Sequence, residues 1–114
     1  GGETRHPFAL NLLTYLEDNY DHATLSEFAA QEHRPLYQIS RAVKAELGVS
    51  FQTLLQKKRF QVALSYLSGT RLPVSDIISA VGYENTSYFY RKFHEKYHMS
   101  PSEYRKLYQQ KNCK

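Results

Sequence analysis

The chain has 114 residues, of which 41% are hydrophobic and 23% are charged, so its composition predicts one compact domain or two small lobes and excludes a disordered segment. No apolar run reaches membrane length, no secretory or transit signal is recognisable, and the single Cys113 has no partner for a disulfide within the chain; we therefore expect a protein of the reducing cytoplasm with no membrane partner. The net charge is +4, but residues 1–33 carry one Arg and six acids while the rest carries fourteen Lys and Arg and five acids, an asymmetry that favours a polyanionic partner.

The first subdomain is predicted over residues 7–49, after a tag remnant or linker at residues 1–6 that opens with Gly-Gly and has no methionine. Apolar residues recur at helical spacing over residues 7–19 and predict the first helix. Thr24 and Glu27 have the spacing of a capping box and predict the start of a second helix. The side chains expected to face the core of this subdomain are Phe8, Leu12, Leu13, Leu16, Leu25, Phe28, Ala29, Leu36, Ile39, Val43 and Leu47.

A long bridging helix is predicted over residues 50–69. Ser50 is its expected cap, and Ser68-Gly69 closes it. At roughly 1.5 Å per residue, a helix of about 18 residues is near 27 Å long and can separate two lobes. Its expected apolar stripe is Phe51, Leu54, Leu55, Ala63 and Leu67.

The second subdomain, predicted over residues 70–114, has the pattern of a helix-turn-helix. Gly82 stands where the first of two short helices needs a left-handed residue to stop, and Asn85 is a good cap for the next. A capping box at residues 100–103 predicts one more helix. The first short helix has an apolar face of Val74, Ile77, Ile78 and Val81, and the last helix is expected to pack through Tyr104, Leu107 and Tyr108.

The helix-turn-helix pattern occurs twice in the chain. A shift of 50 residues aligns a third helix at about residues 35–48 with the second recognition helix, and the helices before them align at a shift of 49, so the turn has gained or lost one residue. Ile39 and Val43 in the first copy align with Phe89 and Phe93 in the second, and polar side chains repeat on the outward face at i, i+3, i+4 and i+7. The candidates for DNA contact are Tyr37, Gln38, Ser40, Arg41, Lys44, Thr86, Ser87, Tyr90, Arg91 and His94.

Two recognition helices in one chain predict a particular way of reading double-stranded DNA. A recognition helix fills a major groove about 12 Å wide, and successive major grooves on one side of B-DNA lie about 34 Å apart. We therefore expect an all-α protein of about seven helices, with two helix-turn-helix subdomains joined by the bridging helix, that occupies adjacent grooves as a monomer. Its site would be asymmetric because the two reading faces carry different side chains.

Several residues of the bridging helix and the second subdomain match a known family. They are Arg59, Ala63, Leu67, Ile78, Val81-Gly82-Tyr83, Ser87-Tyr88-Phe89, Arg91, Phe93, Ser100-Pro101 and Tyr104-Arg105. With them, residues 8–108 resemble the DNA-binding domain of AraC/XylS-type transcription regulators. The resemblance implies a two-lobed all-α domain in a bacterial cytoplasm, activation of transcription by contact with RNA polymerase, and a separate sensing or dimerisation domain. It implies no cofactor.

Three places depart from the pattern of that family. Arg34 and Pro35 stand where members usually have an apolar residue and then a capping Ser, and Val43 stands where Phe is more usual. A Ser cap contributes about 1 kcal/mol, so we expect the first recognition helix to be held less firmly than the second. His98 replaces the usual Gly at a helix end, which predicts a non-Gly residue in the left-handed region.

One alternative function is zinc-dependent proteolysis, because residues 94–98 spell HExxH. In that motif two His side chains one helical turn apart hold zinc, and the Glu is the general base. No third ligand follows His98 at a suitable distance, so we expect neither a metal nor an enzymatic activity. His94 then contacts phosphate or is merely exposed, and His98 is a helix-end residue.

A second alternative is a helical module for protein interaction. Such a module needs the apolar stripes but has no use for polar side chains that repeat on both recognition helices, so the repeated faces favour DNA. Lys57-Lys58-Arg59 fits a phosphate clamp or, for Arg59, structural salt bridges between the lobes.

Overall fold

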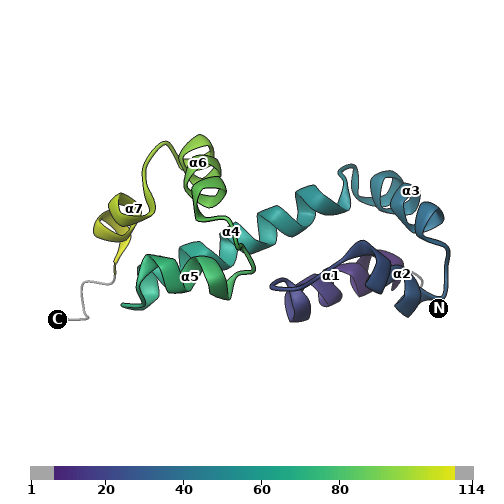
Figure 1. Cartoon of the computed structure of the whole chain (residues 1–114). Coiled ribbons are helices and arrows are strands. Elements are labelled where there is room, and N and C mark those ends of the chain that lie inside the picture. The colour runs from purple at the N-terminus through teal and green to yellow at the C-terminus, as the bar shows by residue number, and fades with distance from the viewer. Residues whose placement is uncertain (1–6, 110–114) are drawn as a thin grey trace. The chain divides into compact units, whose positions relative to one another are not determined.

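The computed structural model of the chain describes residues 7–109, and within this range it forms seven α-helices and no strand (Figure 1). The predicted all-α class is confirmed. The chain divides into two compact units, residues 1–58 and residues 59–114, and the boundary falls inside the fourth helix. No helix in the described range is long and apolar enough to cross a membrane. The expected tag remnant or linker at residues 1–6 lies outside the described residues.

The first unit packs three helices and the start of a fourth around one core. These helices are α1 (Pro7–Asn19), α2 (Leu25–Glu32), α3 (Leu36–Leu47) and the first half of α4 (Phe51–Gly69). The ring of Phe28 on α2 lies 5.8 Å from that of Phe8 and 5.4 Å from that of Tyr15, both on α1. Ile39 and Val43 of α3 are fully buried in the same core. These two residues attach one side of α3 to the core, and the opposite side of the helix faces outward.

Two of the predicted core leucines in this unit are exposed, so those two predictions were wrong. Leu13 is 49% exposed because the buried stripe of α1 is centred on Leu12 and Leu16, and Tyr15 fills the flank instead. Leu36 is 48% exposed because it stands in the first turn of α3. Helical side chains lean toward the N-terminus, so a side chain in the first turn leans past the edge of the core.

Hydrogen bonds to α1 complete the start of α2. The Thr24 hydroxyl accepts a hydrogen bond from the Glu27 backbone N–H at 3.0 Å, which confirms the predicted cap. In a full capping box, the Glu27 side chain would accept a hydrogen bond from the Thr24 backbone N–H. Here that N–H donates to the Tyr15 hydroxyl at 3.0 Å instead. The Glu27 carboxylate accepts a hydrogen bond from that hydroxyl. Burial, with the neighbouring carboxylate, raises the pKa of Tyr15.

The second unit is built around the ring of Phe60. Its helices are the second half of α4, α5 (Val74–Ala80), α6 (Thr86–Tyr97) and α7 (Pro101–Tyr108). Phe60 is fully buried and stacks on Phe89 with ring centroids 5.0 Å apart, and the Phe93 ring lies 6.2 Å away. Tyr83 and Tyr97 flank the same ring at 5.6 and 6.3 Å. The predicted stripe of α4 omitted Phe60, although it is the centre of this core.

Polar contacts attach α7 to the end of α4. Arg105 Nε–H donates to the carbonyl oxygen of Leu67 at 3.0 Å, and its Nη2 donates to that of Thr70 at 3.1 Å. Gln109 Nε2 donates to the same Thr70 oxygen at 2.9 Å. The last carbonyl groups of a helix have no helical donor, so Arg105 satisfies the Leu67 oxygen in the last turn of α4, and the Thr70 oxygen just after it receives two donors.

The predictions that Leu107 and Tyr108 pack α7 onto the core were wrong, because Leu107 is 63% and Tyr108 is 53% exposed. The inward side of α7 is formed by Pro101, which is buried, and by Tyr104, whose ring lies 6.1 Å from that of Phe93. Arg105 takes the next place on that side through its contacts with α4. Leu107 is one turn from Tyr104 but about 120° around the helix from Pro101 and about 160° from Arg105, so it lies at the margin of that side.

Both helix pairs turn through a residue in the left-handed region. His33 follows α2 with φ 60°, and Gly82 follows α5 with φ 102°. In each turn, the N–H of the next residue donates to the carbonyl oxygen five residues before it, at 3.1 Å. Two residues separate His33 from Leu36, and three separate Gly82 from Thr86. The one-residue difference predicted for the turn is therefore confirmed, and it follows the left-handed residue.

The two recognition helices, α3 and α6, are built alike. The sequence of buried, half-buried and exposed residues is the same over residues 41–50 as over residues 91–100. Gly48 ends α3 with φ 79°, and His98 ends α6 with φ 59°, which confirms the left-handed His98. The repeat in the sequence is therefore a repeat in the structure.

Candidate nucleic-acid interface

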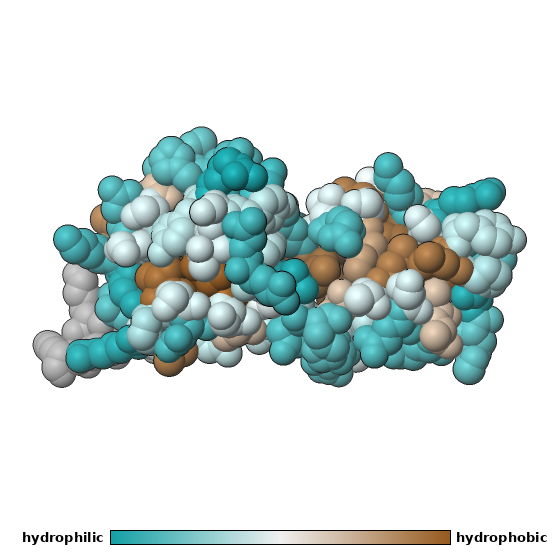
Figure 2. Space-filling model, viewed as in Figure 1, coloured by the Kyte–Doolittle hydropathy of each residue, from teal (hydrophilic) through white to brown (hydrophobic). Residues whose placement is uncertain are grey.

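The second recognition helix, α6, is capped and anchored along one side. Asn85 Oδ1 accepts a hydrogen bond from the Tyr88 backbone N–H at 2.9 Å, which confirms the predicted cap. Phe89 and Phe93 are fully buried beside Phe60. The surface over α6 that faces the viewer in Figure 2 is mostly hydrophilic. α6 therefore presents polar side chains from a rigid support.

The first recognition helix, α3, begins without a side-chain cap. Its N-cap is Pro35, which offers no side-chain acceptor. The first turn is bridged instead by Arg34, whose Nε–H donates to Gln38 Oε1 at 2.7 Å. Further along, Ile39 and Val43 hold α3 to the core. The start of α3 is thus held by the Arg34–Gln38 hydrogen bond, whereas α6 has a side-chain cap on its backbone.

All ten residues predicted to contact DNA lie on α3 or α6, and all ten are exposed. The structure therefore brings together five side chains on each helix. Two of them are aromatic residues with unusually exposed rings, since Tyr37 is 64% and Tyr90 is 43% exposed. Contact of these ten residues with DNA remains a prediction. They are Tyr37, Gln38, Ser40, Arg41 and Lys44 on α3, and Thr86, Ser87, Tyr90, Arg91 and His94 on α6.

Two aromatic rings position three cations in the second unit. Arg91 and Lys92 lie over the Tyr88 ring, with their charged groups 5.5 and 5.7 Å from its centroid. The Tyr88 ring is 5.9 Å from that of Tyr83, which lies beneath the Arg59 guanidinium at 5.1 Å. Cation–π contact of this kind restrains long side chains while their charge stays available to an anion. The second unit therefore holds three positive charges around the Tyr83 and Tyr88 rings.

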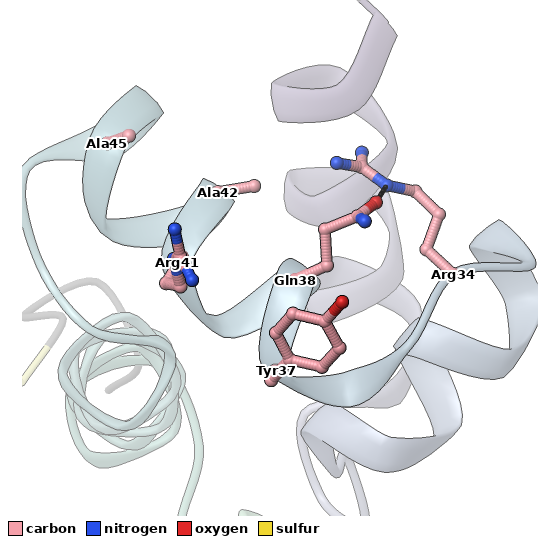
Figure 3. Close-up of a pocket in the computed structure, with 6 residues that line it drawn as sticks. All are labelled: Arg34, Tyr37, Gln38, Arg41, Ala42 and Ala45. Carbon is pink, nitrogen blue, oxygen red and sulfur yellow. Dashed lines mark hydrogen bonds between the residues drawn. The ribbon is translucent and has the colours of Figure 1, made fainter.

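A hollow of about 580 Å³ opens on α3 beside its reading face (Figure 3). Two of its lining residues, Ala42 and Ala45, are small, whereas the aligned residues of α6 are Lys92 and Glu95. Short side chains therefore leave room on this side of α3, where the aligned positions of α6 carry long side chains. The described residues that line it are Arg34, Tyr37, Gln38, Arg41, Ala42 and Ala45.

Arg34 is a candidate functional residue that sequence reasoning missed. Its guanidinium lies 5.6 Å from the centroid of the Phe8 ring, and its side chain is half-buried. The signal in the sequence was the i, i+4 spacing of Arg34 and Gln38, together with Glu84 at the aligned position of the repeat. The contact between Arg34 and Phe8 joins residues that are distant in sequence, so no pattern in the sequence indicated it.

The HExxH residues do not form a zinc-binding face. His94 lies in the last turn of α6, but His98 is past the end of the helix in the left-handed region. The two side chains therefore do not follow each other on one helical face, as the zinc motif requires. Among the described residues there is no group of three His, Cys, Asp or Glu side chains that could hold a metal ion.

The basic triplet at residues 57–59 is divided between different contacts. Lys58 forms an ion pair with Glu17 of α1, within the first unit. Arg59 lies over the Tyr83 ring, within the second unit. Lys57 is exposed. The triplet is therefore not a single clamp, because two of its members are held against different partners.

Comparison with known proteins decides the family. A family model described as a helix-turn-helix domain matches residues 28–107, which include both recognition helices. The chain belongs to this family, of the AraC/XylS type.

Individual relatives and solved structures agree with this assignment. Transcriptional activator NphR from Rhodococcus sp is 34% identical over 83 residues, which cover 73% of this chain and 24% of NphR. The C-terminal domain of AraT, a response regulator from Geobacillus stearothermophilus, is 30% identical with a TM-score of 0.85, over 96% of this chain and 92% of that one. The DNA-binding domain of AdpA, solved in complex with a target DNA, shares the fold with a TM-score of 0.79 at 19% identity, over 91% of this chain and 94% of that one. The chain spans about a third or less of several curated relatives, with shares of 11%, 30% and 34%.

Proposed function

We propose that this chain is the DNA-binding part of a bacterial transcription regulator and that it binds double-stranded DNA sequence-specifically, with α3 and α6 in successive major grooves. One observation carries the proposal: two helices of the same build each bury one side and expose five polar or aromatic side chains on the other. An α-helix fits the major groove, where the edges of all four base pairs differ.

The chemistry of the two faces suits DNA. Arg41 and Arg91 occupy aligned positions, and a guanidinium can donate two parallel hydrogen bonds to guanine or clamp a phosphate. Tyr37 and Tyr90 present exposed rings to bases or sugars. Because the other polar residues differ between the faces, the two half-sites would differ in sequence.

The relatives support a regulatory role for the whole protein. NphR is named a transcriptional activator, and AraT is described as a response regulator. We infer that this chain acts in the same way, as the DNA-reading part of an activator that contacts RNA polymerase and is controlled by a sensing or dimerisation domain. The family consists of DNA-binding regulators and not of enzymes, so we infer no catalytic role.

The test is binding to duplexes selected from a random DNA pool, measured by fluorescence anisotropy with the chain as it stands. We expect a preferred site of about two helical turns, and affinity that falls steeply between about 50 and about 200 mM salt because Lys and Arg displace counterions from phosphates. Inserting about five base pairs between the half-sites should abolish tight binding, because half a turn moves one groove to the other side of the duplex. Binding that ignores salt and spacing would contradict the two-groove proposal.

A further inference from the structure

We propose that Arg34 and Gln38 form a phosphate-binding site of the first unit, and that Gln38 contacts the DNA backbone and reads no base. The proposal rests on the proposed function of DNA binding. It assigns a role to Arg34, which the repeat does not predict, and it narrows the DNA contact predicted for Gln38 to the sugar–phosphate backbone.

Arg34 is held in place from two sides. The Phe8 ring of α1 supports its guanidinium at 5.6 Å, and Gln38 of α3 accepts its Nε–H at 2.7 Å. The hydrogen bond uses Nε–H, and the ring contact uses the flat face of the guanidinium. The two terminal NH₂ groups have no hydrogen-bond partner among the described residues and are visible in Figure 3 at the edge of the hollow. An arginine fixed in this way loses little side-chain entropy when it binds an anion.

The hydrogen bond to Arg34 also decides what Gln38 offers to a ligand. A guanidinium has no acceptor, so the Gln38 amide must turn its oxygen toward Arg34 and its NH₂ group outward. The outward groups of the pair are therefore all donors, two NH₂ groups from Arg34 and one from Gln38. A phosphate oxygen only accepts hydrogen bonds and carries charge, so it matches such a site. An adenine edge requires a donor and an acceptor side by side and matches it poorly.

Space for a phosphate group lies next to these donors. Ala42 and Ala45 present only methyl groups to the hollow of about 580 Å³, and Arg41 stands at its other side (Figure 3). With Arg34 and Arg41, two cations face the same hollow, and no acid is among the described residues that line it. A stretch of sugar–phosphate backbone can therefore approach this side of α3.

The second unit has no equivalent site. A shift of 50 residues places Glu84 at the position of Arg34 and Tyr88 at that of Gln38. A carboxylate at the first of these positions repels phosphate, and Tyr88 supports Arg91 and Lys92 instead. The phosphate-binding site of Arg34 and Gln38 is therefore specific to the first unit, whose recognition helix lacks a side-chain cap.

Two substitutions test the site on the selected duplex. Arg34→Met keeps the side-chain stem over Phe8 but removes the donors, and we expect affinity to fall about tenfold for every sequence in a panel of single-base changes. The salt slope, log affinity against log salt, should become shallower by about one. Gln38→Leu should weaken binding a few-fold, again for all sequences alike. Lys106→Ala removes one exposed charge from α7 and is the matched control, with affinity and slope near those of the unsubstituted chain.

Arg34→Lys separates charge from geometry and guards against a folding defect in the Met variant. It keeps the positive charge, so the salt slope should stay, but it cannot form the guanidinium fork, so affinity should drop a few-fold. A changed base preference at one position in Gln38→Leu would overturn the proposal, because Gln38 would then read a base. So would an Arg34→Met variant that binds like Lys106→Ala. If the unsubstituted chain binds no selected duplex, the proposed function itself fails, and this site fails with it.

Discussion

Replacing Phe60 with Ala should unfold the second unit while leaving the first unit largely intact. Phe60 is fully buried, and its ring has four aromatic neighbours, from Tyr83 to Tyr97. Truncation of a fully buried Phe costs about 3–5 kcal/mol. A unit of about 56 residues, 59–114, has a free energy of unfolding of roughly 3–8 kcal/mol, so the loss takes most of it. Because Ala favours helix, the cost comes from packing and not from α4 itself.

Hydrogen exchange read by mass spectrometry measures this effect unit by unit. In Phe60→Ala, amides of α5 and α6 should lose most of their protection, whereas amides of α2 and α3 should keep theirs, because the two cores share no buried ring. DNA binding should then lose the contribution of α6. Leu107→Ala is the control, since its side chain is 63% exposed and its truncation should change stability by less than about 0.5 kcal/mol.

Two results would refute this reasoning. A loss of less than about 1.5 kcal/mol in urea unfolding would mean that Phe60 is not the centre of the core. Equal loss of protection in both units would mean that they unfold as one cooperative body, and the assignment of separate cores would be wrong.

Five further substitutions test the reading faces, the helix ends and the attachment of α7. Arg91→Ala should weaken DNA binding by about 1–3 kcal/mol and relax base discrimination in one half-site, whereas Arg41→Ala should weaken binding less and act on the other half-site. Binding to a panel of single-base changes compares the two variants, and equal weakening for all sequences would make both arginines phosphate contacts. His98→Gly should raise the free energy of unfolding by up to about 1 kcal/mol, because φ is 59° there, whereas Gly48→Ala at φ 79° should lower it by a similar amount. Arg105→Ala should destabilise the second unit by about 1–3 kcal/mol in urea unfolding, since it removes the side-chain donor to the Leu67 oxygen of α4 and one of the two donors to the Thr70 oxygen, and a loss no larger than that of Lys106→Ala would contradict this.

The helices and their repeat could be predicted from the sequence because their signals are local. Caps act within three residues, and those at Ser50, Asn85 and Ser100 all accept the backbone N–H that their positions require. The periodic apolar residues of 7–19 and the spacing of the two turns are likewise read along the chain. Eight of the ten exposed candidates, all but Gln38 and Thr86, followed from the same periodicity.

Features that depend on where a core ends could not be predicted in this way. Leu36 and Leu107 have helical positions that suit burial as well as exposure, and only the extent of the neighbouring helices decides between them. Phe60 was overlooked because its partners come from helices much later in the chain. Arg34 was missed for the same reason, since Phe8 is 26 residues away in sequence.

The two recognition helices share one build but depend on different forces, and this difference has a consequence for DNA binding. α6 is fixed by a cap and by aromatic packing, interactions that salt screens little. α3 starts without a cap and is steadied by Arg34, a charged residue that we assign to the DNA backbone. Binding of a phosphate at that place would both hold the duplex and order the first turn of α3. As salt rises, the half-site read by α3 should therefore be the first to lose its contribution to binding affinity. At high salt, single-base changes in that half-site should reduce affinity less than single-base changes in the half-site read by α6.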